Sequence, residues 1–272
     1  MDLVALLHYA FLQNALSASC AVAACSAVIG YFLIGRGLTF AGHALPNIGF
    51  AGAAGAVLLG VSPVFGLFSF TIGAALVFAF LGNEVHDRDL GIGIVMTFCL
   101  GLGLFFLAFY SGYAERVYGI LFGTILGISD AEVRLTLISS VITLVGVAVI
   151  FRPLLFSTAD AGSALARGVP IHFVATIFLI LTAVTVSLAV QVTGSLLVFT
   201  LLVGPAATAR TFSRHPAVVV GLAVILAEAY VIIGIFLAVV TKTIPVSFFV
   251  AALSFGAYLA SRLLQKGKIW KR

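Results

Sequence analysis

The chain has 272 residues, of which 62% are apolar and only 8% are charged, and its formal net charge is +5. Its mean hydropathy of +1.27 is too high for a protein that must cover a water-soluble core with polar groups. These values exclude a cytosolic enzyme, a disordered protein and a nucleic-acid-binding protein, and they favour a polytopic helical membrane protein.

Long apolar runs follow one another along the chain, each near the roughly 20 residues that cross a bilayer as a helix. We expect spans near residues 15–34, 38–60, 63–82, 91–110, 135–155, 172–191, 194–212, 216–240 and 246–264. Only Val192-Thr193 joins the sixth and seventh runs, so eight spans with one broken helix is the alternative. Because the loops are short, residues 1–272 are expected to form one all-α transmembrane domain of eight or nine spans.

Basic residues are spread unevenly over the two sets of loops. With the N-terminus outside, only Arg116, Arg134 and Lys242 fall in outside loops. The inside loops and the C-terminus then hold Arg36, Arg88, Arg152, Arg167, Arg210, Arg214, Arg262, Lys266, Lys268, Lys271 and Arg272. The positive-inside rule therefore predicts an outside N-terminus and an inside C-terminus. The basic tail is either in contact with anionic membrane lipid or a simple flank of the last span.

Two polar side chains interrupt the second apolar run. His43 and Asn47 are four residues apart and so share one helix face, and Pro46 between them cannot donate a hydrogen bond to the carbonyl of Gly42. An imidazole, an amide oxygen and a free carbonyl near mid-membrane fit a transient divalent-cation site. Imidazole suits zinc, iron, nickel or copper, and oxygen donors also suit manganese. The alternative is a hydrogen-bonded pair between helices that binds no ligand.

Glu228 is the only carboxylate deep inside an expected span. An ionised acid that faces lipid at this depth costs about 2.5–3.5 kcal/mol on insertion scales. We therefore expect Glu228 to face the interior of the bundle or a wet cavity. Its role is that of a cation ligand, a proton carrier or a partner of a basic or polar group.

The inside loop at residues 156–171 has the signature of a short helix. Asp160 is expected to cap a helix through Ala161 to Arg167, which Gly168 ends and Pro170 prevents from continuing. So short a helix is not stable alone in water, so we expect it to dock on the lipid surface or on a cytoplasmic partner. The chain has no GxxxxGK[ST], HExxH or GxSxG motif, so we expect a protein that is not an enzyme.

Five blocks of the sequence carry a family resemblance. They are GRGLTFAGHALPNIGFAG in the second run, DLGIGI from Asp89, YGILFGTILGIS from Tyr118, the pattern D-x-x-x-A-x-x-x-G-x-P formed by Asp160, Ala164, Gly168 and Pro170, and GSLLVFTLLVGPAATAR from Gly194. A known family of membrane permeases has similar motifs in the same order. They are GDALSHAVLPG, DTAIGI, LFGNILAIS, the same D-x-x-x-A-x-x-x-G-x-P pattern in its cytoplasmic coupling loop, and a run that ends in PAAAAR. The chain thus resembles the zinc/manganese/iron permease family, the membrane subunits of ATP-binding-cassette (ABC) metal importers.

The resemblance implies a multi-pass protein of the bacterial cytoplasmic membrane. A second copy of the permease would complete a central path, and an extracytoplasmic solute-binding protein would deliver the metal. Cytoplasmic ATPases would dock on the loop that holds Asp160, Ala164, Arg167, Gly168 and Pro170. The divalent metal would be the transported substrate, and no resident cofactor is implied.

The chain departs from the family at the second-run motif. His43 stands where the family has Asp, Asn47 stands where it has His, and Pro46 replaces Ser. The local carboxylate is therefore missing, and we hypothesise that Glu228 supplies the negative charge from another helix. Import of a metal chelate or another small solute by the same architecture is one alternative. A self-powered secondary transporter is another.

Overall fold

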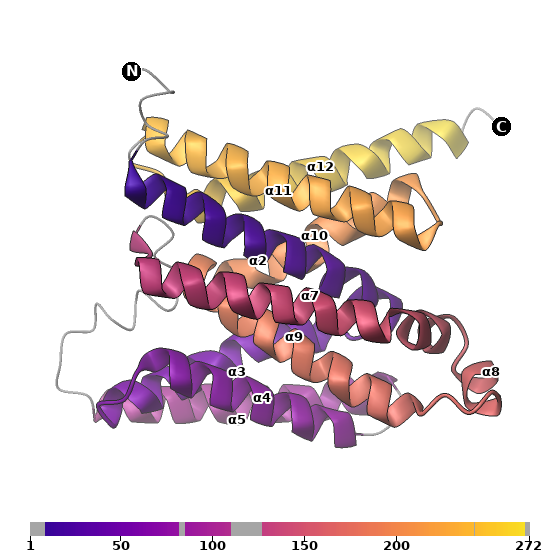
Figure 1. The fold of residues 1–272 in the computed structure, drawn as a ribbon, viewed down its shortest axis with the longest axis horizontal. Helices are drawn as coiled ribbons and strands as arrows, with labels where there is room; N and C mark the ends of the chain where they lie inside the picture. Colours follow the sequence, from indigo (N-terminus) through magenta and orange to yellow (C-terminus); the bar gives the residue numbers. More distant parts are fainter. Residues whose placement is uncertain (1–8, 82–84, 110–126, 242, 270–272) are drawn as a thin grey trace.

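The computed structural model describes residues 9–81, 85–109, 127–241 and 243–269, and this part of the chain is helical without any strand (Figure 1). Its ten helices are α2 (Ala10–Gly35), α3 (Thr39–Leu58), α4 (Pro63–Phe80), α5 (Val85–Ala108), α7 (Asp130–Ala159), α8 (Ala161–Ala166), α9 (Ile171–Thr193), α10 (Ser195–Phe212), α11 (Pro216–Thr241) and α12 (Val246–Ile269). The sequence block that begins at Tyr118 lies mostly outside the described residues.

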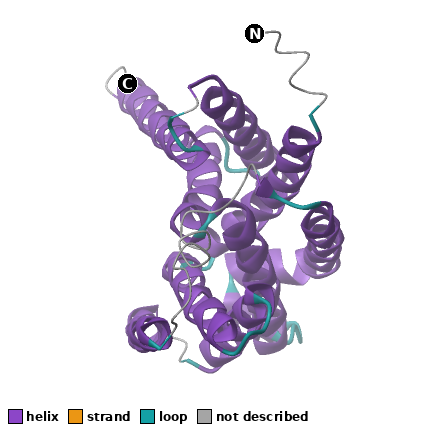
Figure 2. Ribbon diagram, turned by 90° about the vertical axis from the view of Figure 1, so that its left-hand side faces the viewer, coloured by secondary structure: helices purple, strands orange, loops and turns teal. Residues whose placement is uncertain are grey.

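The helices form one bundle with three groups (Figures 1 and 2). Helices α3, α4 and α5 lie at one side, α11 and α12 lie at the opposite side, and α2, α7, α9 and α10 lie between them. Helix α2 packs on α7, α9, α10 and α11, while α9 packs on α4 and α7. The interior is made of small and aliphatic side chains, with the fully buried rings of Phe32, Phe78 and Phe178 among them.

Each expected apolar run forms a helix. Seven of these helices are long and apolar enough to cross a membrane, namely α2, α4, α5, α7, α9, α11 and α12. Helix α3 carries His43, Pro46 and Asn47, and the apolar part of α10 is short, which is why these two helices are less typical of spans. The predicted all-α membrane bundle is thus confirmed as a fold class.

The boundary between α9 and α10 is a single residue, Gly194, with φ of 83° and ψ of 154°. This backbone conformation is essentially restricted to glycine. The sixth and seventh runs are therefore two separate helices.

Helix α7 begins five residues before the expected span. Ser129 and Glu132 form a capping box: the Ser129 Oγ accepts from the Glu132 backbone at 3.4 Å, and the Ser129 backbone donates to Glu132 Oε2 at 2.9 Å. These bonds satisfy backbone N–H groups that a helix start leaves unpaired. Capping extends the helix beyond the apolar run, and hydropathy alone does not detect such an extension.

Helices α3 and α4 approach each other more closely than side chains allow. A methyl group placed on Gly52 would overlap the carbonyl oxygen of Gly66, and one placed on Gly66 would overlap that of Gly52. The two backbones are therefore in direct contact, as is typical of small residues at helix crossings in membranes.

Candidate functional site

The helix that carries the predicted metal ligands is almost wholly buried. Between Ala41 and Val57, the only residues of α3 that are not buried are His43 and Asn47. His43 is exposed and Asn47 is half-buried, and their spacing places them on the same face. The described structure thus brings these two predicted residues together on one polar, accessible stripe of an otherwise apolar helix.

Two neighbouring helices frame this stripe. The imidazole of His43 meets the ring of Phe199 on α10 edge-on, with 5.4 Å between the ring centres. The amide nitrogen of Asn47 donates to the backbone carbonyl of His43 at 2.9 Å and lies 3.8 Å from the thioether sulfur of Met96 on α5. The side-chain oxygen of Asn47 accepts no hydrogen bond from a described residue. An imidazole nitrogen and this oxygen are therefore open to a ligand.

Met96 is a neighbour of the site that the sequence reasoning missed. Its sulfur contacts Asn47, and the residue is half-buried. A thioether is a soft, uncharged donor that favours late transition metals over manganese. The available signal was weak, since Met96 is one of only two methionines in the chain and lies in an apolar run.

Glu228 lies in another part of the bundle. It is half-buried on α11, and its carboxyl group lies next to the thiol of Cys20 on α2. Helix α11 packs on α2, α10 and α12, and α3 packs on α2, α4, α5, α9 and α10. The two helices share α2 and α10 as neighbours but do not pack extensively on each other. In a single chain the structure therefore does not group Glu228 with the His43–Asn47 stripe. Among the described residues, no three His, Cys, Asp or Glu side chains gather to hold a metal ion.

The expected short helix in the loop at residues 156–171 is present as α8. Asp160 is its N-cap, and the Asp160 carboxylate accepts hydrogen bonds from the backbone N–H of Ser163, at 3.1 Å, and from the Ser163 hydroxyl. These hydrogen bonds lower the pKa of Asp160 from its ordinary value. Arg167 caps the C-terminal end, Gly168 follows with φ of 77°, and Pro170 precedes α9.

Helix α8 is docked on the bundle by one side only. Ala164 is fully buried, and α8 packs on α7 and α9. On the other side Leu165 is 65% exposed, and the exposed Arg167 lies over the ring of Phe156 at 5.4 Å. This arrangement presents a small apolar and basic surface at the end of the bundle where α2, α4 and α7 end.

Comparisons with known proteins agree with these features. The chain is 34% identical over 233 residues to the manganese transport system membrane protein MntC of Listeria monocytogenes, covering 85% of this chain and 82% of that protein. It is 30% identical over 213 residues to the high-affinity zinc uptake system membrane protein ZnuB of Haemophilus influenzae, covering 78% and 82%.

Solved structures show the same fold. PsaBC from Streptococcus pneumoniae superposes with a TM-score of 0.84 at 25% identity, covering 95% of this chain and 93% of that one. The inward-facing structure of a transporter assigned to the metal-chelate type of ABC transporters superposes with a TM-score of 0.74 at 21% identity, over 98% and 91% of the chains. The sequence model of the ABC 3 transport family matches residues 8–265, so nearly the whole chain belongs to this family of ABC transport membrane proteins.

Proposed function

We propose that this chain is the membrane subunit of an ABC importer for a divalent metal ion, with zinc, manganese or iron as the substrate. The observation that carries the proposal is the stripe formed by His43 and Asn47, the only accessible residues in the buried length of α3. Family membership and the names of the manganese and zinc relatives support the same substrate class.

The path would lie between two copies of the chain. An exposed imidazole beside a half-buried amide is costly where a helix faces lipid, so such groups normally face protein or water. A second copy placed over the His43 face would exclude lipid from it and bring two neutral ligand pairs together. A site without a carboxylate lacks the negative charge that strengthens the binding of a divalent ion, and weaker binding would help the ion to leave the path.

Glu228 remains our proposed source of negative charge along this path. It lies against α2 and not beside His43, so it would act on the ion at a separate stage or through its field. Charges act over longer distances in the low-dielectric interior of a bilayer than in water.

The proposed topology would put the proposed partners on opposite faces of the membrane. The chain would cross the bacterial cytoplasmic membrane nine times, with the N-terminus outside and the C-terminus inside. ATPase subunits would dock on α8 through the surface formed around Leu165 and Arg167, and a solute-binding protein would dock outside. ATP hydrolysis would take place in the partner, and movement of α8 would switch the path between outward-facing and inward-facing states.

The decisive experiment is metal uptake by the complete complex in sealed vesicles. We expect ATP-dependent uptake of zinc, manganese or iron, and a loss of at least about tenfold for His43→Ala, equal to ~1.4 kcal/mol or more. His215→Ala is the matched control, since His215 is exposed in the loop before α11. Uptake of a chelate but not the free ion would favour the chelate alternative, and uptake without the ATPase would favour a secondary transporter.

A further inference from the structure

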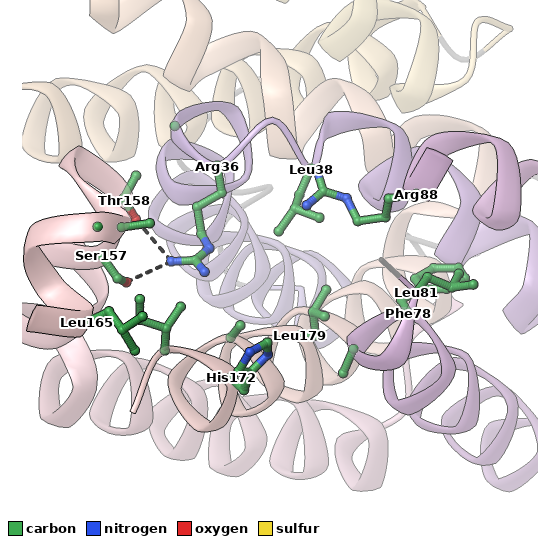
Figure 3. A pocket seen from close by; sticks show the side chains of 16 residues that line it. Arg36, Leu38, Phe78, Leu81, Arg88, Ser157, Thr158, Leu165, His172 and Leu179 are labelled. Carbon is green, nitrogen blue, oxygen red and sulfur yellow. Dashed lines mark hydrogen bonds between the residues drawn. The ribbon is translucent and has the colours of Figure 1, made fainter. Parts of the chain in front are cut away.

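A cavity of about 550 Å³ lies at the same end of the bundle as α8. The ends of α2, α4 and α7 and the beginnings of α5, α8 and α9 surround it (Figure 3). Its polar lining includes Arg36, in the turn after α2, Arg88 on α5 and His172 on α9 (Figure 3). This volume is in the usual range for a small-molecule site.

The two arginines in this cavity lack acidic partners among the described residues. Arg36 donates to the hydroxyl groups of Ser157 and Thr158, at 2.9 and 3.4 Å, and Arg88 donates to the carbonyl of Gly37 at 2.9 Å. These acceptors are neutral, and no described carboxylate lines the cavity. The Nε of Arg88 is buried without a hydrogen-bond partner. Burial and the nearby charge of Arg88 both lower the pKa of Arg36.

A pair of half-buried guanidinium groups without a counter-ion among the described residues is unfavourable, because the positive charge of each is only partly compensated by neutral acceptors. An anion with several oxygens would relieve this repulsion. Arginine forms bidentate hydrogen bonds with phosphate, and these are among the stronger hydrogen bonds in proteins. The donor set therefore fits a phosphate group.

The apolar part of the cavity indicates which kind of molecule carries the phosphate group. Phe78, Leu81 and Leu179 line it beside the arginines. Large aromatic side chains next to the lining point out of the bundle: Phe80 at the end of α4 is 88% exposed, and Phe173 at the start of α9 is 64% exposed. Exposed apolar side chains such as these are suited to contact with acyl chains, so we expect the cavity to lie next to the lipid phase.

We propose that this cavity binds the phosphate group of an anionic membrane lipid, held by Arg36 and Arg88, with the glycerol and upper acyl chain against the apolar lining. Basic pockets between helices on the cytoplasmic side of membrane proteins are suited to such headgroups. The cavity lies between α8 and the rest of the bundle, so a bound lipid would join the docking segment to the bundle. Free phosphate shares the same chemistry, and the experiment distinguishes the two sources.

The test is native mass spectrometry of the full chain in a neutral detergent, with three probes: phosphatidylglycerol, phosphatidylcholine and inorganic phosphate. We expect one phosphatidylglycerol per chain to be retained, and much less of the other two. Arg88→Gln should weaken phosphatidylglycerol binding about tenfold. This variant leaves the bonds of Arg36 to α7 in place and removes the bond of Arg88 to the Gly37 carbonyl, so the helical circular dichroism of the variant is compared with that of the wild type. Arg88→Lys should recover part of the affinity, and Arg36→Gln/Arg88→Gln should lose the site.

Arg214→Gln is the matched control, because it removes an exposed positive charge from the same end of the bundle but not from the cavity. It should bind phosphatidylglycerol like the wild type. Equal losses in Arg88→Gln and Arg214→Gln would show a non-specific surface effect and overturn the proposal. If the chain retains inorganic phosphate but not phosphatidylglycerol, the ligand of the cavity is free phosphate, and the lipid proposal is wrong. If Arg88→Gln binds the lipid normally but binds the ATPase more weakly, Arg88 contacts an acidic side chain of the ATPase and not a lipid. This result would overturn the proposal. None of these outcomes depends on transport, so the proposed function is tested separately.

Discussion

The side-chain amide of Asn47 donates a hydrogen bond to the backbone carbonyl of His43, 2.9 Å away. The donor end of the amide is thereby turned back along α3, and its oxygen is left free on the same face as the imidazole. The two residues form an uncharged pair of ligands in a stretch of α3 where every other residue is buried. This relationship makes a direct prediction about which ions the site prefers.

Asn47→Asp should change the metal preference. A carboxylate adds negative charge and a hard oxygen ligand, and manganese depends on such ligands more than zinc does. We expect the ratio of manganese to zinc uptake by the complete complex to rise about tenfold, equal to ~1.4 kcal/mol. Asn47→Gln keeps an amide and should leave the ratio near that of the wild type. If the aspartate variant has the wild-type ratio at normal expression, residue 47 is not a ligand.

Glu228→Gln should lower metal uptake, because it removes the proposed negative charge while preserving the shape of the side chain. We expect a decrease of roughly tenfold, or ~1.4 kcal/mol, with normal amounts of protein in the membrane. Cys20→Ser is the control, since a hydroxyl keeps a hydrogen-bonding group next to the carboxyl. Unchanged uptake in Glu228→Gln removes this residue from the mechanism. Equal losses in both variants would assign the contact between α2 and α11 a structural role.

The cap of α8 should depend on pH in a defined direction. Because hydrogen bonds from Ser163 lower the pKa of Asp160 in the folded protein, the cap stabilises α8 fully above the ordinary pKa of about 4. Its contribution is lost as the pH falls through the lower folded-state pKa. We expect hydrogen exchange at the Ser163 amide, corrected for its intrinsic rate, to stay slow down to about pH 4 and to accelerate below it.

Asp160→Asn provides the comparison for this experiment. Asparagine caps helices about as well as aspartate but does not titrate, so protection of the Ser163 amide should become independent of pH. Asp160→Ala should lose the protection at every pH, because alanine cannot accept the hydrogen bond. Loss of protection in the wild type already near neutral pH would contradict this account.

Gly194→Ala should destabilise the protein. The backbone at Gly194 has φ of 83° and ψ of 154°, and a residue with a Cβ is strained there by about 1–3 kcal/mol. The measurement is the free energy of unfolding in detergent, followed by the loss of helical circular dichroism. Gly221→Ala is the control: a Cβ there meets open space on α11, and we expect no loss or a gain of up to about 1 kcal/mol. Equal stability of both variants would mean that the α9–α10 junction relaxes.

Hydropathy predicted the helices well because the bilayer imposes a length on each span. The expected runs at 216–240 and 63–82 correspond closely to α11 and α4. A larger difference lies where another force extends a helix: α7 begins at Asp130 because of the Ser129–Glu132 capping box. Helix α2 also begins earlier than expected, at Ala10, without a side-chain cap. The short helix α8 was predictable from Asp160 and Gly168, because capping is a local property of the sequence.

The neighbours of each helix were not predictable in the same way. Spacing along one helix placed His43 and Asn47 on one face, which the structure confirms. It carries no information on which other helix faces them, so the contacts with Met96 and Phe199 were missed. The carboxylate missing from the second-run motif suggested that Glu228 supplies negative charge from another helix, and this stays a prediction. The structure places Glu228 next to Cys20 on α2, a neighbour that the sequence did not indicate.

The backbone contact between Gly52 and Gly66 restricts how the proposed transporter can move. With no side chain between them, α3 cannot rotate about its own axis without lifting away from α4, and α5 packs on another face of α3. The helix that carries His43 therefore moves as part of a rigid three-helix block. Among the described residues, the margins at which this block can rock are the turn at residues 36–38, the packing of α3 on α2, α9 and α10, and the packing of α4 on α9. Opening and closing of the path would thus be a tilt of the whole block.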